Sequence, residues 1–316
     1  MNIINSQIFN ENFFQNTINS PIFFNGVGIH SGKAVNMTLF PADDDFGIVF
    51  KRIDLETGNY IKVIPDNIDF SKYCSKLKNE HGVYVSTVEH LLATLHSFDI
   101  NNVLIEINSP ELPAMDGSSY EFAKRFLEVG LQTQNKPKKV LKIRKKVSIK
   151  EGLRSIKILP SNHLSFSIKI NFSNNLIGKD QYDYTHNTQN FIDEICYART
   201  FCISKDVLKL RAAGFGLGGN LNNAIVVDDN KVLNSSGLRC DKEFVKHKIL
   251  DCIGDFYMSG LPLLGSVHAK QPGHELNNKL LKKIFQNKDN YEIVEINPYH
   301  VPIPHQENII NNINVA

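Results

Sequence analysis

The sequence has neither a regular cysteine pattern nor an excess of charge of one sign. Its five cysteines form no C-x-x-C pair and are odd in number, which favours free thiols in a reducing compartment over a disulfide framework. The formal net charge of +2 gives no electrostatic case for binding nucleic acid. The composition therefore argues against a disulfide-rich secreted scaffold, and we expect no nucleic acid as a partner.

A secretion signal and a membrane-spanning segment are missing as well. The opening stretch, MNIINSQIFNENFFQNTINS, has no basic start and no long apolar run. Nowhere does the chain contain an uncharged apolar run long enough to span a bilayer. We expect a cytoplasmic location and no transmembrane segment.

The length of 316 residues exceeds what one hydrophobic core usually holds, which predicts two domains. Strand-like and helical patterns follow one another in a similar order in both halves of the chain. The polar stretch LQTQNKPKKVLKIRKK interrupts this order. We place the boundary within residues 135–138, which gives an N-terminal domain over residues 1–136 and a C-terminal domain over residues 137–316.

Lysines are concentrated near this boundary, between Lys136 and Lys150. We interpret the run as a linker followed by an exposed strand face. Contact with an anionic membrane surface is the alternative.

Local patterns predict the main elements of both halves. Strands are expected at AVNMTLF, FGIVFKRI and NNVLIEI in the first half and at VLKI, LSFSIKINF and NAIVVDD in the second. Helices are expected over residues 86–96, after the turn at Asp116 and Gly117, at SKDVLKLRAAG and over residues 244–257.

The stretch FVKHKILDCIGDFY, residues 244–257, combines an apolar helical stripe with charged residues. On a helical wheel Asp251 lies about 40° and Asp255 about 80° from His247, and the apolar residues lie on the other side. Gly254 lowers the helix propensity by roughly 1 kcal/mol and leaves space beside His247 and Asp251. One interpretation is a solvated face with i,i+4 charge pairs. The other is a metal site, because an imidazole and a carboxylate one turn apart can share one ion such as zinc.

A third ligand is expected in STVEHLLATLH. Ser86 and Glu89 fit the capping box S-x-x-E, which predicts that a helix begins at Ser86. His90 then points away from the apolar stripe of this helix, as a surface histidine or as a ligand. Glu89 beside it either caps the helix or acts as general base on water. The H-E-x-x-H motif is absent, so a zincin protease is not expected.

Six blocks of the sequence together resemble one enzyme family. GVGIHSGK, VSTVEHLLATL, ELPAMDGSS, ARTF, EFVKHKILDCIGD and GHELNNKLL occur in the order seen in the UDP-3-O-acyl-N-acetylglucosamine deacetylases, the zinc amidases of lipid A synthesis. The resemblance covers nearly the whole chain, except the Asn-rich start and the polar tail after Asn297. It implies an α+β fold of two domains with similar topology, each a β-sheet layered with α-helices, and an active site between them.

The resemblance also implies a ligand set and a reaction. The ligands of one catalytic Zn2+ ion would be His90, His247 and Asp251, and Fe2+ could occupy the same site. Glu89 would activate the water that attacks the N-acetyl group of UDP-3-O-acyl-N-acetylglucosamine.

Further roles follow from the same resemblance. Thr200 would hydrogen-bond the oxyanion. His274 would stabilise the oxyanion as a cation and protonate the leaving amine, and Asp255 would orient it. Lys248 would neutralise substrate phosphate. Phe201, with the apolar residues around AAGFGLGG, would line the passage for the acyl chain or pack in the core.

Other positions carry less information. His30 matches a family block near the site and is expected to contact substrate. Glu275 follows His274 where a small residue is expected, and the basic residue expected before Gly273 is found as Lys270. These departures leave the nucleotide contacts open.

Two other classes of function are compatible with parts of the sequence. GFGLGG, residues 214–219, fits the G-x-G-x-x-G of dinucleotide-binding oxidoreductases, but a helix is expected before it and a strand after it, the reverse of a Rossmann context. A non-catalytic binder of a sugar nucleotide or acyl chain would be favoured if Glu89 or a ligand were missing. The sequence does not determine the acyl-chain length or the oligomeric state, for which we expect a monomer.

Overall fold

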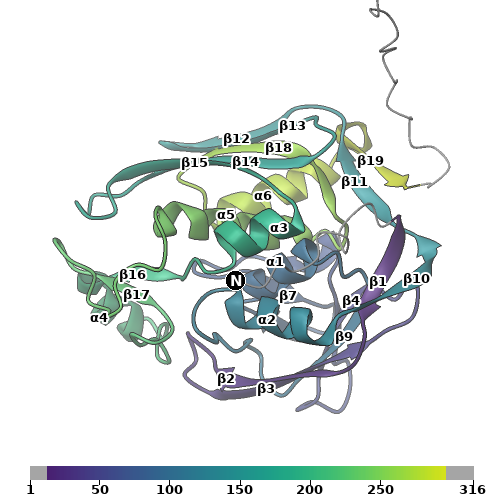
Figure 1. The fold of residues 1–316 in the computed structure, drawn as a ribbon, viewed down its shortest axis with the longest axis horizontal. Helices are drawn as coiled ribbons and strands as arrows, with labels where there is room; N and C mark the ends of the chain where they lie inside the picture. Colours follow the sequence, from purple (N-terminus) through teal and green to yellow (C-terminus); the bar gives the residue numbers. More distant parts are fainter. Residues whose placement is uncertain (1–12, 297–316) are drawn as a thin grey trace, which may run out of the picture.

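The computed structural model describes residues 13–296, in which helices lie between two β-sheets (Figure 1). The seven-stranded sheet lies at the top of Figure 1 and the five-stranded sheet in the lower half, with α1 (Glu89–Ser97), α5 (Glu243–Tyr257) and α6 (His274–Phe285) between them. The predicted α+β class is confirmed. The tail after Asn297 and most of the Asn-rich start lie outside the described residues.

The five-stranded sheet comes from the first half of the chain and has the order β2-β3-β9-β4-β5. Its neighbours are antiparallel except β4 and β9, which are parallel. Alternation along the strands buries one face, as at Met37 and Leu39. The strands are β2 (Ile22–Val27), β3 (Ala34–Pro41), β4 (Ile48–Arg52), β5 (Tyr60–Lys62) and β9 (Val103–Ile107).

Smaller elements complete the first half. A three-stranded sheet consists of β6 (Ile68–Asp69), β7 (Lys76–Lys78) and β8 (Tyr84–Ser86), and β1 (Phe14–Ile18) pairs with β10 (Leu131–Pro137). The helix α2 (Tyr120–Val129) and the 3-10 turn η1 (Pro65–Asn67) complete this half. The predicted helix after Asp116 and Gly117 is confirmed as α2.

The seven-stranded sheet comes from the second half and has the order β12-β13-β18-β11-β19, with β14 paired to both β18 and β15. Buried residues such as Ile156, Phe166 and Val267 alternate with polar ones, so one face packs on α5 and α6 and the other faces solvent. The strands are β11 (Lys139–Ile143), β12 (Val147–Glu151), β13 (Arg154–Leu159), β14 (Leu164–Asn171), β15 (Lys179–Thr185), β18 (Leu263–Lys270) and β19 (Tyr291–Glu295).

A small unit protrudes beside these layers at the left of Figure 1. Strands β16 (Phe201–Ile203) and β17 (Ile225–Val227) are parallel and are joined through α4 (Ser204–Ala212). The remaining short helices are α3 (Thr188–Asn190), η2 (Phe191–Ile195) and η3 (Lys288–Asn290). Among residues 13–296, no helix has both the length and the apolar character that crossing a bilayer requires.

The polar side of α5 is not a solvated face. His247 and Asp251 are 2% and 1% exposed, because α1 packs against this side of the helix. The space that Gly254 leaves is filled by the main chain of Glu89. The i,i+4 surface-pair interpretation was therefore wrong.

The capping-box prediction was also wrong, because α1 begins at Glu89 and not at Ser86. Ser86 ends strand β8, where its Oγ donates a hydrogen bond to the carbonyl of Pro110, and Thr87 has a φ of 59°. Strand pairing holds this segment out of the helix. The Glu89 carboxylate accepts a hydrogen bond from the backbone N of Ser75 instead of closing a cap.

The segment from Lys136 to Lys150 contains no linker. Strand β10 ends at Pro137 and β11 begins at Lys139, so the two strands are almost continuous. Lys136 is paired with Asp45, and most of the run is strand. The exposed strand face is confirmed for β12, and the division into domains at residues 136 and 137 stays a prediction.

Candidate metal centre and active site

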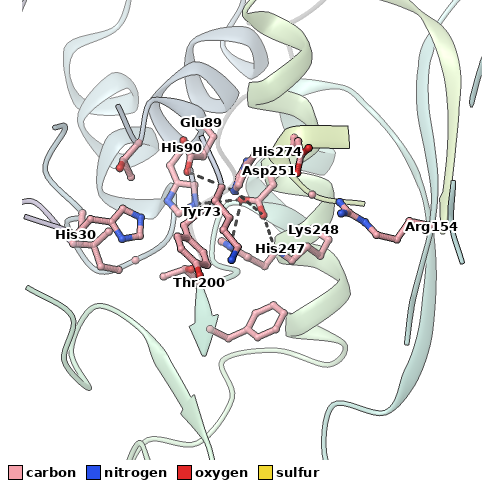
Figure 2. Close-up of a pocket in the computed structure, with 18 residues that line it drawn as sticks. His30, Tyr73, Glu89, His90, Arg154, Thr200, His247, Lys248, Asp251 and His274 are labelled. Carbon is pink, nitrogen blue, oxygen red and sulfur yellow. Dashed lines mark hydrogen bonds and ion pairs between the residues drawn. The ribbon is translucent and has the colours of Figure 1, made fainter. Parts of the chain in front are cut away.

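Side chains from both halves of the chain meet in one pocket of ≈ 380 Å³ (Figure 2). Figure 2 shows Glu89 and His90 facing His247 and Asp251 across it. Asp255 does not line the pocket and lies behind His274. The predicted residues that do line it are His30, Glu89, His90, Thr200, Phe201, His247, Lys248, Asp251 and His274.

His90, His247 and Asp251 form a compact group of nitrogen and oxygen atoms. The Nε2 atoms of His90 and His247 lie 3.5 and 3.4 Å from Oδ1 of Asp251. One candidate ligand atom from each residue lies within 4.8 Å of the other two. The side chain of His90 is 12% exposed and lines the pocket, whereas the other residues of α1 are buried, so its predicted orientation away from the core is confirmed.

Hydrogen bonds outside this group turn its donor atoms inward. Nδ1 of His247 is 3.1 Å from the carbonyl oxygen of Ala198, so this nitrogen carries the proton and Nε2 keeps a free lone pair. Oδ2 of Asp251 accepts a hydrogen bond of 2.8 Å from Nζ of Lys248, whereas Oδ1 is buried without a hydrogen-bond partner. Two imidazole nitrogens beside an unpartnered carboxylate oxygen fit a divalent ion with open coordination positions.

The charges of the group favour metal binding. Burial lowers the pKa of His247 to about 3, so its imidazole is neutral at neutral pH. Burial alone would raise the pKa of Asp251, but His247 and Lys248 hold it well below its usual range. The group therefore offers an anionic oxygen and at least one neutral imidazole without first having to lose protons.

His274 forms a charged pair with two carboxylates. Its Nδ1 lies 3.1 Å from both oxygens of Asp255, and its Nε2 lies 3.7 Å from Oε1 of Glu89. Burial works to lower the pKa of His274, but Asp255 and Glu89 outweigh it and raise the pKa to about 10. Burial raises the pKa of Glu89. The pocket thus holds an imidazolium and a carboxylate of raised basicity side by side.

Ser75 connects these two carboxylates and was missed by the sequence analysis. Its backbone N donates to Oε2 of Glu89 at 3.0 Å, and its Oγ donates to Oδ1 of Asp255. Asn277 donates to the other oxygen of Asp255 at 2.7 Å. Ser75 lies in SKYCSKL, which contains no motif, so only the fold brings it to the site.

Lys248 is already engaged within the site. Burial works to lower the pKa of its ammonium, but the pair with Asp251 outweighs this effect and raises it. Its Nζ also lies 5.3 Å from the centroid of the Phe201 ring. Lys248 therefore holds Asp251 in place, whatever it does for a substrate.

Thr200 and His30 are fixed mainly through their backbones. The N of Thr200 donates to Gly117 at 2.7 Å, and the N of His30 donates to Oε1 of Glu111 at 2.7 Å. The His30 ring packs edge-on to Phe215 at 5.4 Å, and burial lowers its pKa.

An apolar cavity of ≈ 340 Å³ adjoins the pocket. Both cavities share residues of their walls, among them His30, Thr200 and Phe201. The far wall of the apolar cavity comes from α4, β17 and the loop between them: Val207, Leu210, Leu221, Ala224 and Val226.

Three cationic or aromatic wall residues were not predicted. Lys72, Tyr73 and Arg154 line the pocket without any motif around them in the sequence. Glu275 also lines it, whereas Lys270 is absent from its walls and lies exposed at the end of β18. Figure 2 shows Arg154 on the side of the pocket opposite His30.

The glycine-rich stretch GFGLGG has the context that the sequence predicts. It follows α4 and precedes β17, so no strand leads into it and no helix begins at its end. This arrangement excludes a Rossmann phosphate loop at these glycines.

The chain is similar over most of its length to one family of known enzymes. The sequence profile of the UDP-3-O-acyl N-acetylglycosamine deacetylase family matches residues 15–286. Three relatives named UDP-3-O-acyl-N-acetylglucosamine deacetylase come from Campylobacter hominis, Actinobacillus pleuropneumoniae and Pasteurella multocida. They are 40%, 42% and 40% identical over 89%, 89% and 92% of this chain, and over 95%, 92% and 96% of their own lengths. With a match across most of its length, the chain belongs to the UDP-3-O-acyl N-acetylglycosamine deacetylase family.

Proposed function

We propose that this protein removes the N-acetyl group of UDP-3-O-acyl-N-acetylglucosamine and releases acetate, which is the committed step of lipid A biosynthesis. The names of relatives that are about 40% identical support the substrate. The observation that carries the proposal is the convergence of His90, His247 and Asp251 beside Glu89 and His274 in one pocket.

We infer that the ion at His90, His247 and Asp251 is Zn2+, with Fe2+ as the alternative. Zinc commonly binds two histidines and one carboxylate in catalytic sites. When bound, the ion polarises the acetyl carbonyl and makes a water molecule more acidic. Lys248 and the carbonyl of Ala198 keep the ligands oriented through their hydrogen bonds.

Glu89 and His274 divide the proton transfers in this mechanism. Glu89, whose burial raises its basicity, takes a proton from the attacking water. His274, held as a cation by Asp255, gives its Nε2 proton to the amine nitrogen as the C–N bond breaks. The Thr200 hydroxyl donates a hydrogen bond to the oxygen that becomes negative.

The two adjoining cavities match the two ends of the substrate. The apolar cavity behind Phe201 would take the 3-O-acyl chain, whereas Lys248, Lys72 and Arg154 would face the diphosphate. His30 lies where the cavities meet, at the expected position of the sugar. We further propose a monomer of two domains, residues 1–136 and 137–316, in the cytoplasm.

Release of acetate tests this function. The purified protein with UDP-3-O-acyl-N-acetylglucosamine should release acetate and the free amine in equal amounts. A chelator should stop the reaction, and added zinc should restore it. Binding of the substrate without acetate release, in the metal-loaded protein, would instead support the non-catalytic binder.

A further inference from the structure

The solvent-facing side of the seven-stranded sheet carries a groove of ≈ 400 Å³ that is distinct from the active-site pocket. Five lysines line it together with serines. We call them the lysine face: Lys146, Lys150, Lys157, Lys169 and Lys270. Figure 1 shows α5 and α6 on the opposite side of this sheet, and none of the helices within residues 13–296 covers the groove.

The strand register places these lysines beside one another. Lys169 of β14 lies directly across from Lys270 of β18, and Lys157 of β13 lies across from His268. Ser155 of β13 lies across from Lys150 of β12 on one side and from Lys270 of β18 on the other, so Lys150, Ser155, Lys270 and Lys169 form one row across four strands. Like charges on directly opposite residues destabilise a sheet, so this row costs stability unless an anion lies over it.

The lysine face lacks the carboxylate partners that nearby lysines have. Lys142 pairs with Glu292, Lys145 with Asp289 and Lys279 with Glu151. Within residues 13–296, no lysine of the lysine face forms an ion pair. On the solvent side of the described strands β12–β15 and β18, the register places one carboxylate, Asp183 on edge strand β15.

An exposed apolar side chain borders the lysine face. Leu153 lies in the turn between β12 and β13 and is 78% exposed. Glu151 and Arg154 form the first strand pair after this turn, and Lys150 and Ser155, which line the groove, form the next pair. A basic surface next to an exposed apolar side chain is typical of proteins that lie on anionic membranes.

We propose that the lysine face docks on a membrane surface rich in anionic phospholipid, with Leu153 at the edge of the contact. The lysines extend over four neighbouring strands spaced about 4.8 Å apart, a span wider than a single phosphate group. Among residues 13–296, no Phe or Tyr lines the groove, although such side chains are the usual platform for nucleic-acid bases. Charge and spacing therefore favour an array of lipid phosphates.

Docking in this way leaves the catalytic pocket accessible. Arg154 lines the pocket and the next residue, Ser155, lines the groove, because successive residues of a strand point to opposite faces. The proposal does not depend on the deacetylase reaction. It differs from the membrane alternative for the run Lys136–Lys150, because three of its five lysines lie outside that run and are brought in by strand pairing.

Vesicle co-sedimentation of the full-length protein tests the proposal. The protein should sediment with vesicles of mixed phosphatidylcholine and phosphatidylglycerol but not with phosphatidylcholine alone. About 1 M salt should release it, because the screening length then falls to about 3 Å. The double variant Lys157→Glu/Lys169→Glu should bind at least about 25-fold more weakly, at roughly fivefold for each lysine lost. Leu153→Ser should also weaken binding at low salt, where the wild type binds.

A matched control separates this face from overall charge. Lys62→Glu/Lys124→Glu makes the same charge change at exposed lysines of the first half and should keep vesicle binding. Acetate release from soluble substrate should stay unchanged in both double variants, since neither touches the pocket. The melting temperature should not fall in either, and Lys169→Glu should raise it slightly, because it places opposite charges on the facing residues 169 and 270. Equal loss in both variants, no binding by the wild type, or tighter binding to RNA or to inorganic phosphate than to the vesicles would each overturn the proposal.

Discussion

Gly254 on α5 lies so close to Glu89 on α1 that no side chain fits between the two helices. A Cβ atom added to Gly254 would be 1.9 Å from the carbonyl oxygen of Glu89. His247 and Asp251 lie on α5 and His90 on α1, so this contact sets the distance between the two parts of the ligand group.

We predict that Gly254→Ala lowers stability and metal content together. Alanine favours a helix by roughly 1 kcal/mol over glycine, so the substitution would stabilise α5 if the contact did not matter. Overpacking against a backbone atom should instead cost about 1–3 kcal/mol. Denaturant unfolding measures whether the variant is less or more stable than the wild type, and metal analysis measures its metal content. A more stable variant with full metal content would contradict the prediction.

The ligand group predicts about one zinc ion per chain in the purified protein. Asp251→Ala should lose most of this metal, because it removes the oxygen between the two imidazoles and leaves Lys248 unpaired. Metal analysis after gel filtration measures the loss. Asp241→Ala, in the turn before α5, is a control that should keep the ion. Full metal and full activity in Asp251→Ala would refute this site.

Glu89→Gln and Glu89→Ala should keep the fold but lower kcat/KM about a hundredfold or more, as loss of a general base typically does. Burial raises the pKa of Glu89 in the folded protein, so its ionised form destabilises the fold at pH values above that pKa. The metal-free Glu89→Gln variant should therefore melt at a higher temperature than the wild type at neutral pH. A residue that only supported the helix would give the opposite result, with normal turnover and lower stability.

The pH profile of kcat/KM should have two limbs, the acidic one from the base and the alkaline one from the acid. Asp255→Ala removes the largest charge that favours protonated His274, so the alkaline limb should move to lower pH and activity should fall. His274→Ala should lose most activity and keep the metal, since His274 is outside the ligand group. Metal loss in His274→Ala, or an unmoved alkaline limb in Asp255→Ala, would contradict the roles assigned here.

His274 should also make stability depend on pH. Its pKa rises from 6.5 to about 10 on folding, so its stabilising contribution is complete below pH 6.5 and is lost as the pH rises towards 10. Melting curves of the metal-free wild type and His274→Ala should therefore differ most at low pH within this range and converge near pH 10.

Ser75→Ala should lower kcat by about tenfold or more, with little change in KM, because a hydrogen bond to a charged group contributes about 1.5–3 kcal/mol. The hydroxyl holds Asp255 behind His274 and makes no contact with the pocket. Ser75→Thr keeps a hydroxyl and should recover most of the activity. Equal losses in both variants with an unchanged melting temperature would show that the hydroxyl does not act through Asp255.

The sequence by itself determined the parts of the site that are local. His247 and Asp251 lie one turn apart on one helix, so helix geometry alone brings them together. The direction of His90 followed from the apolar stripe of α1 for the same reason. Glu89 followed as the neighbour of His90, either a helix cap or a general base. Motif order across the chain added Thr200 and His274, which no spacing rule could have joined.

Only the tertiary structure decided what depends on distant segments. Ser75 lies between Glu89 and Asp255 only in the folded chain, and the polar side of α5 is buried because α1 packs against it. Helix α1 begins at Glu89 because Ser86 belongs to strand β8. The lysine face likewise exists only through the pairing of β12, β13, β18 and β14. Strand register is set by side-chain packing over the whole sheet, and no single stretch of sequence contains that information.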